Sequence, residues 1–156
     1  MMTEKQLLYV NMGCVITFGL FLFLSFVTAE ADATQGVMIL ISEIIGGLTL
    51  LCAIISLFYI KTDQRYMPVA ILTFLIPWIL FAIGYELGFD ATTDYTWIWF
   101  IGLYLLLIAG FILMKTCYSK VLNAYKLVPA FLIFINGILF VYLIFIHIWW
   151  SLPFAD

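Results

Sequence analysis

Three ionisable side chains lie inside long apolar stretches of the sequence, where they could take part in chemistry. They are Glu43, Glu86 and His147. Ionisable groups are costly inside a membrane, so each one indicates a functional site by default. A carboxylate close to an imidazole, which titrates near neutral pH, could sense external pH or relay a proton. These residue types also bind divalent metals, but three ligands on separate helices have no spacing that predicts a metal site.

Each of the three residues also has a purely structural explanation. Glu86 and His147 lie within one turn of the ends of their apolar stretches, so both side chains can reach water at the lipid headgroups. Glu43 lies deeper, roughly 9 Å inside its stretch at 1.5 Å per residue. At that depth its carboxylate either forms a hydrogen bond within the helix bundle or faces a solute pathway. Glu43 is therefore the best single candidate for a pathway residue.

One aromatic and one amide side chain complete the set of candidates. Trp78 follows Pro77 in the middle of an apolar stretch, and proline there occurs both in plain packing and beside cavities. Asn136, like Asn11, lies well inside a stretch; an interhelical hydrogen bond is the commoner role, and lining a pore is the alternative. The candidate binding or pathway residues are Glu43, Glu86, His147, Trp78 and Asn136.

The sequence contains none of the motifs that soluble enzymes use. It has no glycine-rich phosphate loop, HExxH, G-x-S-x-G or paired CxxC. We therefore expect no catalytic residue, no cofactor and no metal site, while the question of an enzyme stays open. Cys14, Cys52 and Cys117 lack the spacing of metal or dithiol sites and are expected to be small core residues or free thiols. No basic cluster predicts a nucleic-acid partner.

The elements that position these residues are predicted to be five transmembrane helices. Of the 156 residues, 67% are hydrophobic and 10% are charged, whereas charged residues make up about a quarter of a soluble domain. A helix needs about 20 apolar residues to cross the bilayer. The predicted spans are residues 7–28, 37–60, 69–89, 97–114 and 128–148. We expect one all-α transmembrane domain over residues 1–156, a five-helix bundle whose consecutive helices are antiparallel neighbours.

The distribution of basic residues predicts the orientation in the membrane. Cytoplasmic loops collect Lys and Arg, and five spans put all the basic residues on the same side. These are Lys5, Lys61, Arg65, Lys115, Lys120 and Lys126. We therefore expect a multi-pass protein of the plasma or inner membrane, with its N-terminus cytoplasmic and its C-terminus external.

One alternative is cleavage of the first span as a signal peptide, because Ala29-Glu30-Ala31 and Ala31-Asp32-Ala33 resemble cleavage sites. The apolar segment is too long for a signal peptide, and Lys5 is the only basic residue before it. We therefore expect a retained helix.

Small residues at four-residue or eight-residue spacing predict close approach between helices. The pairs are Gly13 and Thr17, Ser42 and Gly46, Gly84 and Gly88, and Gly102 and Gly110.

Several short stretches, in order along the chain, resemble the small bacterial urea and short-chain amide channels. They are Leu7-Leu8-Tyr9-Val10, Gly46-Gly47-Leu48 with Cys52, Pro68, Ala82-Ile83, Gly88, Asp90, Tyr95, Trp97 and Gly137-Ile138-Leu139. The resemblance implies a solute channel in which Trp78 matches an aromatic position of the selectivity filter. This sequence departs from the family in three ways. It lacks the Trp-rich fifth of six spans, it has Asn136 at an acidic filter position, and its loops carry the opposite charge bias.

Two functions fit these patterns. The first is a channel or transporter for a small neutral solute or a proton, with a pocket near Glu43, Glu86 and His147 and with Trp78 as a constriction. The second is a non-catalytic accessory subunit of a membrane complex or an immunity-type membrane protein. Both place the chain in the lipid bilayer, and both predict a homo-oligomer or a membrane-protein partner.

Overall fold

The computed structural model describes residues 3–28 and 32–152, and over these ranges the chain is all-helical, with no strand. Its five long helices are α1 (Glu4–Val27), α2 (Asp32–Tyr59), α3 (Tyr66–Glu86), α4 (Thr96–Lys120) and α5 (Leu127–Trp150). Two short 3-10 helices, η1 (Asp63–Arg65) and η2 (Asn123–Lys126), precede α3 and α5. All five long helices have the length and apolar composition needed to cross a membrane, as the sequence predicts.

All ten helix ends differ from the predicted ranges by at least one residue, and three of these differences have a local explanation. At its N-terminal end α2 begins at Asp32, since no proline interrupts the polar residues before the apolar stretch. Helix α4 continues to Lys120, where a basic side chain in the last turn complements the helix dipole.

Helix α3 ends early because Gly88 has a φ of 70°. The Phe89 N–H then donates to the Gly84 carbonyl at 3.0 Å, and the Gly88 N–H donates to the Tyr85 carbonyl at 3.0 Å. This is the Schellman arrangement that ends many helices. Gly88 therefore ends α3, whereas the sequence pattern predicts that it brings two helices together.

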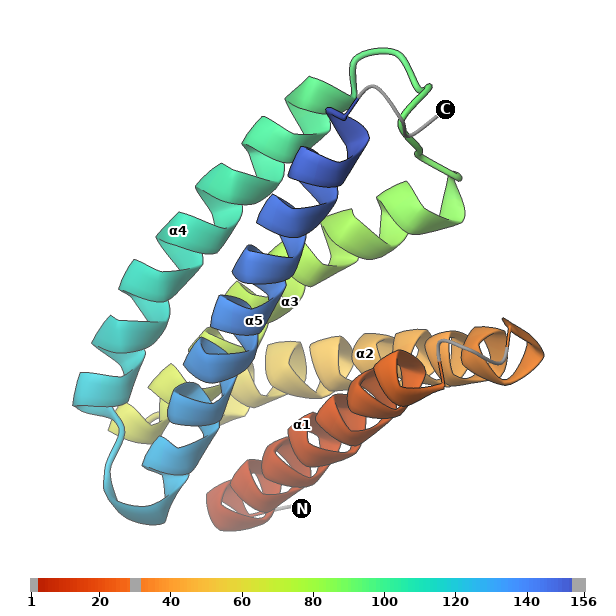
Figure 1. Cartoon of the computed structure of the whole chain (residues 1–156). Helices are drawn as coiled ribbons and strands as arrows, with labels where there is room; N and C mark the ends of the chain where they lie inside the picture. The colour runs from red at the N-terminus through yellow and green to blue at the C-terminus, as the bar shows by residue number, and fades with distance from the viewer. Residues whose placement is uncertain (1–2, 29–31, 153–156) are drawn as a thin grey trace.

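Helix α3 is the centre of the bundle. It contacts α2, α4 and α5, while α1 packs mainly along α2. Accordingly, 56% of an 18-residue apolar stretch of α3 is buried, against 22–28% for the corresponding stretches of the other four helices. In Figure 1 the α1–α2 pair diverges from α3, α4 and α5 toward the end that carries the α3–α4 connection. The helices therefore pack closely at one end of the bundle and separate at the other, and we call these the packed end and the divergent end.

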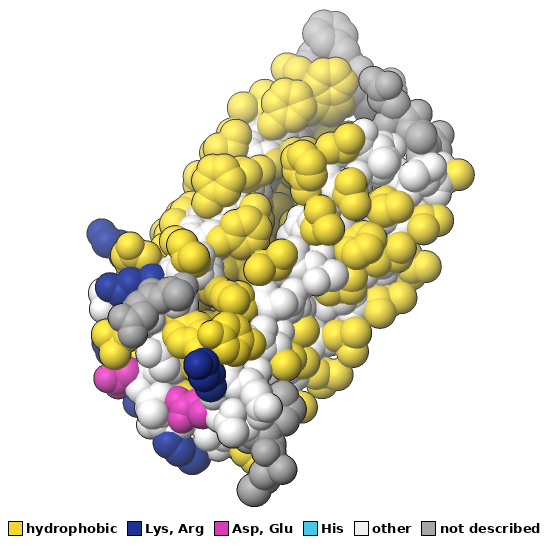
Figure 2. All heavy atoms as spheres, turned by 90° about the horizontal axis from the view of Figure 1, so that it is seen from below, with side chains coloured by type: hydrophobic (Ala, Val, Ile, Leu, Met, Phe, Trp, Pro, Cys, Tyr) yellow, Lys and Arg dark blue, Asp and Glu magenta, His cyan; other side chains and the backbone are white. Residues whose placement is uncertain are grey.

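Apolar side chains cover most of the outer surface. Ile16, Phe23, Leu51, Phe58 and Leu105, among others, are each more than half exposed. Figure 2 shows hydrophobic side chains over most of one face, with Lys and Arg gathered at one end. Monomeric soluble proteins rarely expose contiguous apolar patches of this extent. The surface therefore fits a lipid environment.

The basic residues lie at or within two turns of the packed end, which also holds the N-terminus and the α2–α3 and α4–α5 connections. Lys120 Nζ donates to the Tyr66 hydroxyl at 3.1 Å and lies 4.5 Å from the centre of that ring. The Thr62 hydroxyl donates to Glu4 and joins the α2–α3 connection to the start of α1. These contacts join α3 to α4 and join α1 to the α2–α3 connection at this end.

Candidate functional site

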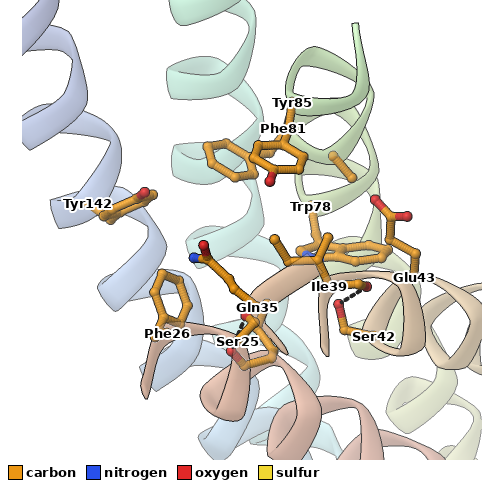
Figure 3. A pocket seen from close by; sticks show the side chains of 12 residues that line it. Ser25, Phe26, Gln35, Ile39, Ser42, Glu43, Trp78, Phe81, Tyr85 and Tyr142 are labelled. Carbon is orange, nitrogen blue, oxygen red and sulfur yellow. Dashed lines mark hydrogen bonds between the residues drawn. The ribbon is translucent and has the colours of Figure 1, made fainter. Parts of the chain in front are cut away.

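A cavity of about 280 Å³ lies between α1, α2, α3 and α5, on the divergent side of the buried Trp78. This volume is close to the lower limit of about 300 Å³ for small-molecule pockets. Figure 3 shows the lining side chains around a common space, with Tyr142 of α5 opposite Glu43 of α2. The polar or ionisable side chains of the lining are Ser25, Gln35, Ser42, Glu43, Trp78, Tyr85 and Tyr142. We call this space the main cavity.

Two further hollows adjoin the main cavity. One, of about 210 Å³, extends toward α5, is lined by Phe74, Ile135 and Leu139, and shares Trp78 and Tyr142 with the main cavity. Its lining is almost entirely apolar, and we call it the apolar extension. The other is a shallower hollow of about 350 Å³, lined by Glu43, Gly47, Trp78 and Glu86 among others, which we call the side hollow.

Glu43 lies in the fourth turn of α2 and borders both the main cavity and the side hollow. Its side chain is partly exposed and lies beside the Trp78 ring in Figure 3. Among the described residues, no hydrogen bond or ion pair engages its carboxylate. Roughly 24 Å of helix axis separates Glu43 from Tyr59, the end of α2 nearest Lys61. The charge of Glu43 therefore faces the cavity without a basic partner from the packed end.

Trp78 forms the floor of the main cavity because Gly46 leaves room for its ring. A Cβ atom at residue 46 would lie 2.6 Å from two ring carbons of Trp78. The Phe18 ring contacts Trp78 edge-on, with 4.8 Å between ring centres. Gly46 thus accepts an aromatic ring, whereas its spacing from Ser42 predicts close approach of a neighbouring helix.

Beyond Trp78, toward the packed end, α3 is tightly packed. Phe74, Ile71 and Met67 are each no more than 1% exposed and belong to the same buried cluster as Trp78. Pro77, directly before Trp78, lacks the N–H that would bond the Thr73 carbonyl. The floor of the cavity therefore stands where the backbone of α3 has lost one of its hydrogen bonds.

The structure brings together two of the three ionisable candidates. Glu86 is exposed and lines the side hollow with Glu43. His147 lies elsewhere, between α4 and α5. Its ring stacks on Phe100 with 4.3 Å between ring centres, and its Nδ1 is 3.0 Å from the Tyr104 hydroxyl.

The rotation of α5 explains this separation. Tyr142 faces the main cavity, and His147, five residues further along, points about 140° away around the helix axis.

Asn136 and Asn11 both form interhelical contacts. The Asn136 Nδ2 donates to the Leu107 carbonyl of α4 at 3.1 Å, and Gly110 leaves room beside the amide. Asn11 Nδ2 donates to the Ser56 hydroxyl of α2 at 2.5 Å. Both side chains are fully buried, and Asn136 is absent from the linings of the main cavity, the apolar extension and the side hollow.

Sequence patterns alone miss several lining residues. Ser25, Gln35, Phe81, Tyr85 and Tyr142 all line the main cavity. Gln35 lies in the turn of α2 that extends beyond the predicted span, and the aromatic residues are indistinguishable from ordinary span residues by composition. Within residues 3–28 and 32–152, no group of three or more His, Cys, Asp or Glu residues is placed to hold a metal ion.

Comparison with known proteins finds no matching family model, no similar curated protein and no similar solved structure. The resemblance to urea and amide channels therefore remains a prediction from the sequence.

Proposed function

We propose that the chain spans the membrane five times, with its N-terminus in the cytoplasm and its C-terminus outside. The apolar cover of the five helices supports the five spans. The gathering of Lys and Arg at the packed end, visible in Figure 2, supports the orientation. The positive-inside rule assigns that end to the cytoplasm. The main cavity then opens on the external half of the membrane.

Single cysteines test this orientation in a chain without its three native cysteines. We expect Thr92→Cys, in the α3–α4 connection, to react with an impermeant maleimide on intact cells. Lys61→Cys should react only after the cells are opened. The reverse pattern would refute the orientation.

We further propose that the protein transports a small solute or a proton by way of the main cavity. The observation that carries this proposal is a cavity with a carboxylate at its edge and Trp78 as its floor. A route that is closed by packed side chains on one side favours a transporter with alternating access over an open channel. In this state the solute site faces outward.

The helix arrangement supplies a mechanism for such alternation. The α1–α2 pair diverges from α3, α4 and α5 toward the divergent end, as Figure 1 shows. Rocking of this pair about Trp78 would close the outer side of the cavity and loosen the packing below it. Pro77 is a natural bending point for α3, because proline removes a backbone hydrogen bond there.

Flux into proteoliposomes tests transport. Uptake of urea and acetamide is measured by stopped flow, and proton flux by an enclosed pH dye, at external pH 5 and 7.5. We expect flux of at least one species above that of empty liposomes, and a reduced flux for Glu43→Gln. Asp94→Asn, in the external loop, is the matched control and should behave as wild type. Flux equal to that of empty liposomes for every species would refute transport of these species.

A second candidate is a non-catalytic subunit that docks on another membrane protein or on a second copy of this chain. Gly13 supports it, since this residue is exposed on α1 with open space where a Cβ would lie, one turn from the exposed Thr17. Mild detergent extraction tests it. Co-purification of a stoichiometric partner that Gly13→Leu abolishes would favour this function, and a monodisperse monomer would contradict it.

A further inference from the structure

The main cavity combines a free carboxylate with aromatic walls and an apolar extension. We propose that its ligand is a small amphiphilic organic cation, with an ammonium group at Glu43 and an apolar group in the extension. If the proposed transport is right, this ligand is its substrate, so the name substrate rests on the proposed function. Binding of the ligand in the cavity does not depend on transport.

Charge is the first argument for a cation. Glu43 borders the cavity without a hydrogen bond or ion pair among the described residues, and Glu86 adds a second negative charge in the side hollow. All the basic residues of the chain lie toward the packed end. His147 is turned away and stacked on Phe100. A charged carboxylate in apolar surroundings is costly unless it is paired, and the ammonium group of a ligand would supply a partner.

The aromatic lining is the second argument. Trp78, Phe81, Tyr85 and Tyr142 contribute rings to the cavity that Glu43 borders (Figure 3). The faces of aromatic rings carry partial negative charge and attract ammonium groups, with Trp the strongest of them. An anion would be repelled by the carboxylate and would gain no such attraction from the rings. The lining therefore selects positive charge by two independent means.

The apolar extension is the third argument, because it indicates the size and the apolar character of the rest of the ligand. It continues from Trp78 and Tyr142 to Phe74, Ile135 and Leu139, and its volume is about 210 Å³. A bare inorganic cation would leave this space unfilled, and it would lose its hydration in apolar surroundings. An organic cation with an aromatic or short aliphatic group fills both parts of the site.

Equilibrium binding tests the proposal, with three probes of similar shape and different charge: benzyltrimethylammonium, benzyl alcohol and benzoate. Binding to purified protein in maltoside micelles, which contain no ammonium group, is measured by isothermal titration calorimetry. We expect benzyltrimethylammonium to bind at least about tenfold more tightly than benzyl alcohol, the ratio expected for a charged partner. Benzoate should not bind. Equal binding of the cation and the alcohol would overturn the proposal.

Matched variants locate the site. Glu43→Gln should weaken cation binding at least about tenfold, whereas Glu43→Asp keeps the charge and should retain most of it. Glu86→Gln removes the carboxylate that lines only the side hollow and should change the affinity far less. Binding by folded Glu43→Gln as tight as that of wild type would show that the charge of Glu43 is not the determinant and would overturn the assignment.

The ammonium could also come from the headgroup of a membrane lipid. Added phosphatidylethanolamine that leaves binding of the probe unchanged supports a free solute, while competition would assign the site to a lipid and overturn the solute proposal. Binding of benzyltrimethylammonium without its flux into proteoliposomes would refute transport of this ligand and leave the ligand class standing. Flux of urea or acetamide without cation binding would support transport and refute the ligand class.

Discussion

A single methyl group added at Gly46 should disturb the floor of the cavity. A Cβ there would lie 2.6 Å from the Trp78 ring, while carbon atoms at ordinary contact are about 3.5–4.0 Å apart. The ring would have to move by roughly 1 Å, and the Phe18 ring packs against it from another side. Overpacking of this kind costs about 1–3 kcal/mol.

Gly47 provides the matched control, since a Cβ at that residue meets nothing within 4 Å. Replacing glycine by alanine within a helix gains about 1 kcal/mol from propensity alone, and this gain applies to both positions. We therefore expect Gly46→Ala to be less stable than Gly47→Ala by about 1–3 kcal/mol. Titration with sodium dodecyl sulfate in maltoside micelles, followed by circular dichroism, measures the difference in free energy of unfolding.

A second substitution separates steric clash from other effects. In a Trp78→Leu background the ring is absent, so the difference between the two alanine variants should shrink to the part due to Phe18, whose Cε2 would lie 3.2 Å from the added Cβ. Equal stability of Gly46→Ala and Gly47→Ala in the wild-type background would refute the packing of Trp78 on Gly46. It would also remove the floor from the proposed cavity.

Three more predictions concern other parts of the fold. The Sγ atoms of Cys14 and Cys52 are 4.0 Å apart across α1 and α2, so oxidation by copper phenanthroline should join them, and mass spectrometry of the joined peptides should detect the disulfide. Hydrogen bonds from the Thr92 hydroxyl and N–H hold the pKa of Asp90 below its usual value of 3.8; this contribution to stability is present at neutral pH and is lost as the pH falls through the lowered pKa. Thermal unfolding should therefore show a smaller loss between pH 7 and pH 3 for Asp90→Asn than for wild type. Asn136→Leu removes one interhelical hydrogen bond and should lower stability by only about 0.6 kcal/mol, with no effect on flux or cation binding.

Each of these predictions has an outcome that would contradict it. Reduced, unlinked Cys14 and Cys52 after oxidation would mean that α1 and α2 pack in another register. An acid sensitivity of Asp90→Asn equal to that of wild type would mean that the hydrogen bonds of Asp90 in the α3–α4 connection do not contribute to stability. Loss of cation binding in a stable Asn136→Leu variant would place Asn136 in the pathway and contradict its role in packing.

Much of the fold follows from local sequence properties. The number of long apolar helices and their approximate ranges were predictable, because apolar length and composition are properties of each segment. Helix ends were less predictable. The early end of α3 depends on the positive φ of Gly88, and the same glycine could equally have been assigned to helix packing.

The candidate site was predictable only in part. Glu43 stands out because a carboxylate is rare inside an apolar helix, and the structure places it at the edge of a cavity. His147 stands out for the same reason, yet it lies on another face of its helix against Tyr104. Tyr142 lines the cavity and gives no signal in the sequence, because tyrosine is common in apolar helices.

The sequence by itself determined five apolar helices, the distribution of charge between their ends, and the presence of a carboxylate deep inside α2. These properties depend on residue order along one dimension. Only the tertiary structure decided which helices meet, where they diverge, and which face of each helix borders the cavity. The physical reason is that residues a few positions apart on one helix point in different directions, so the rotation and packing of whole helices select which side chains share a space.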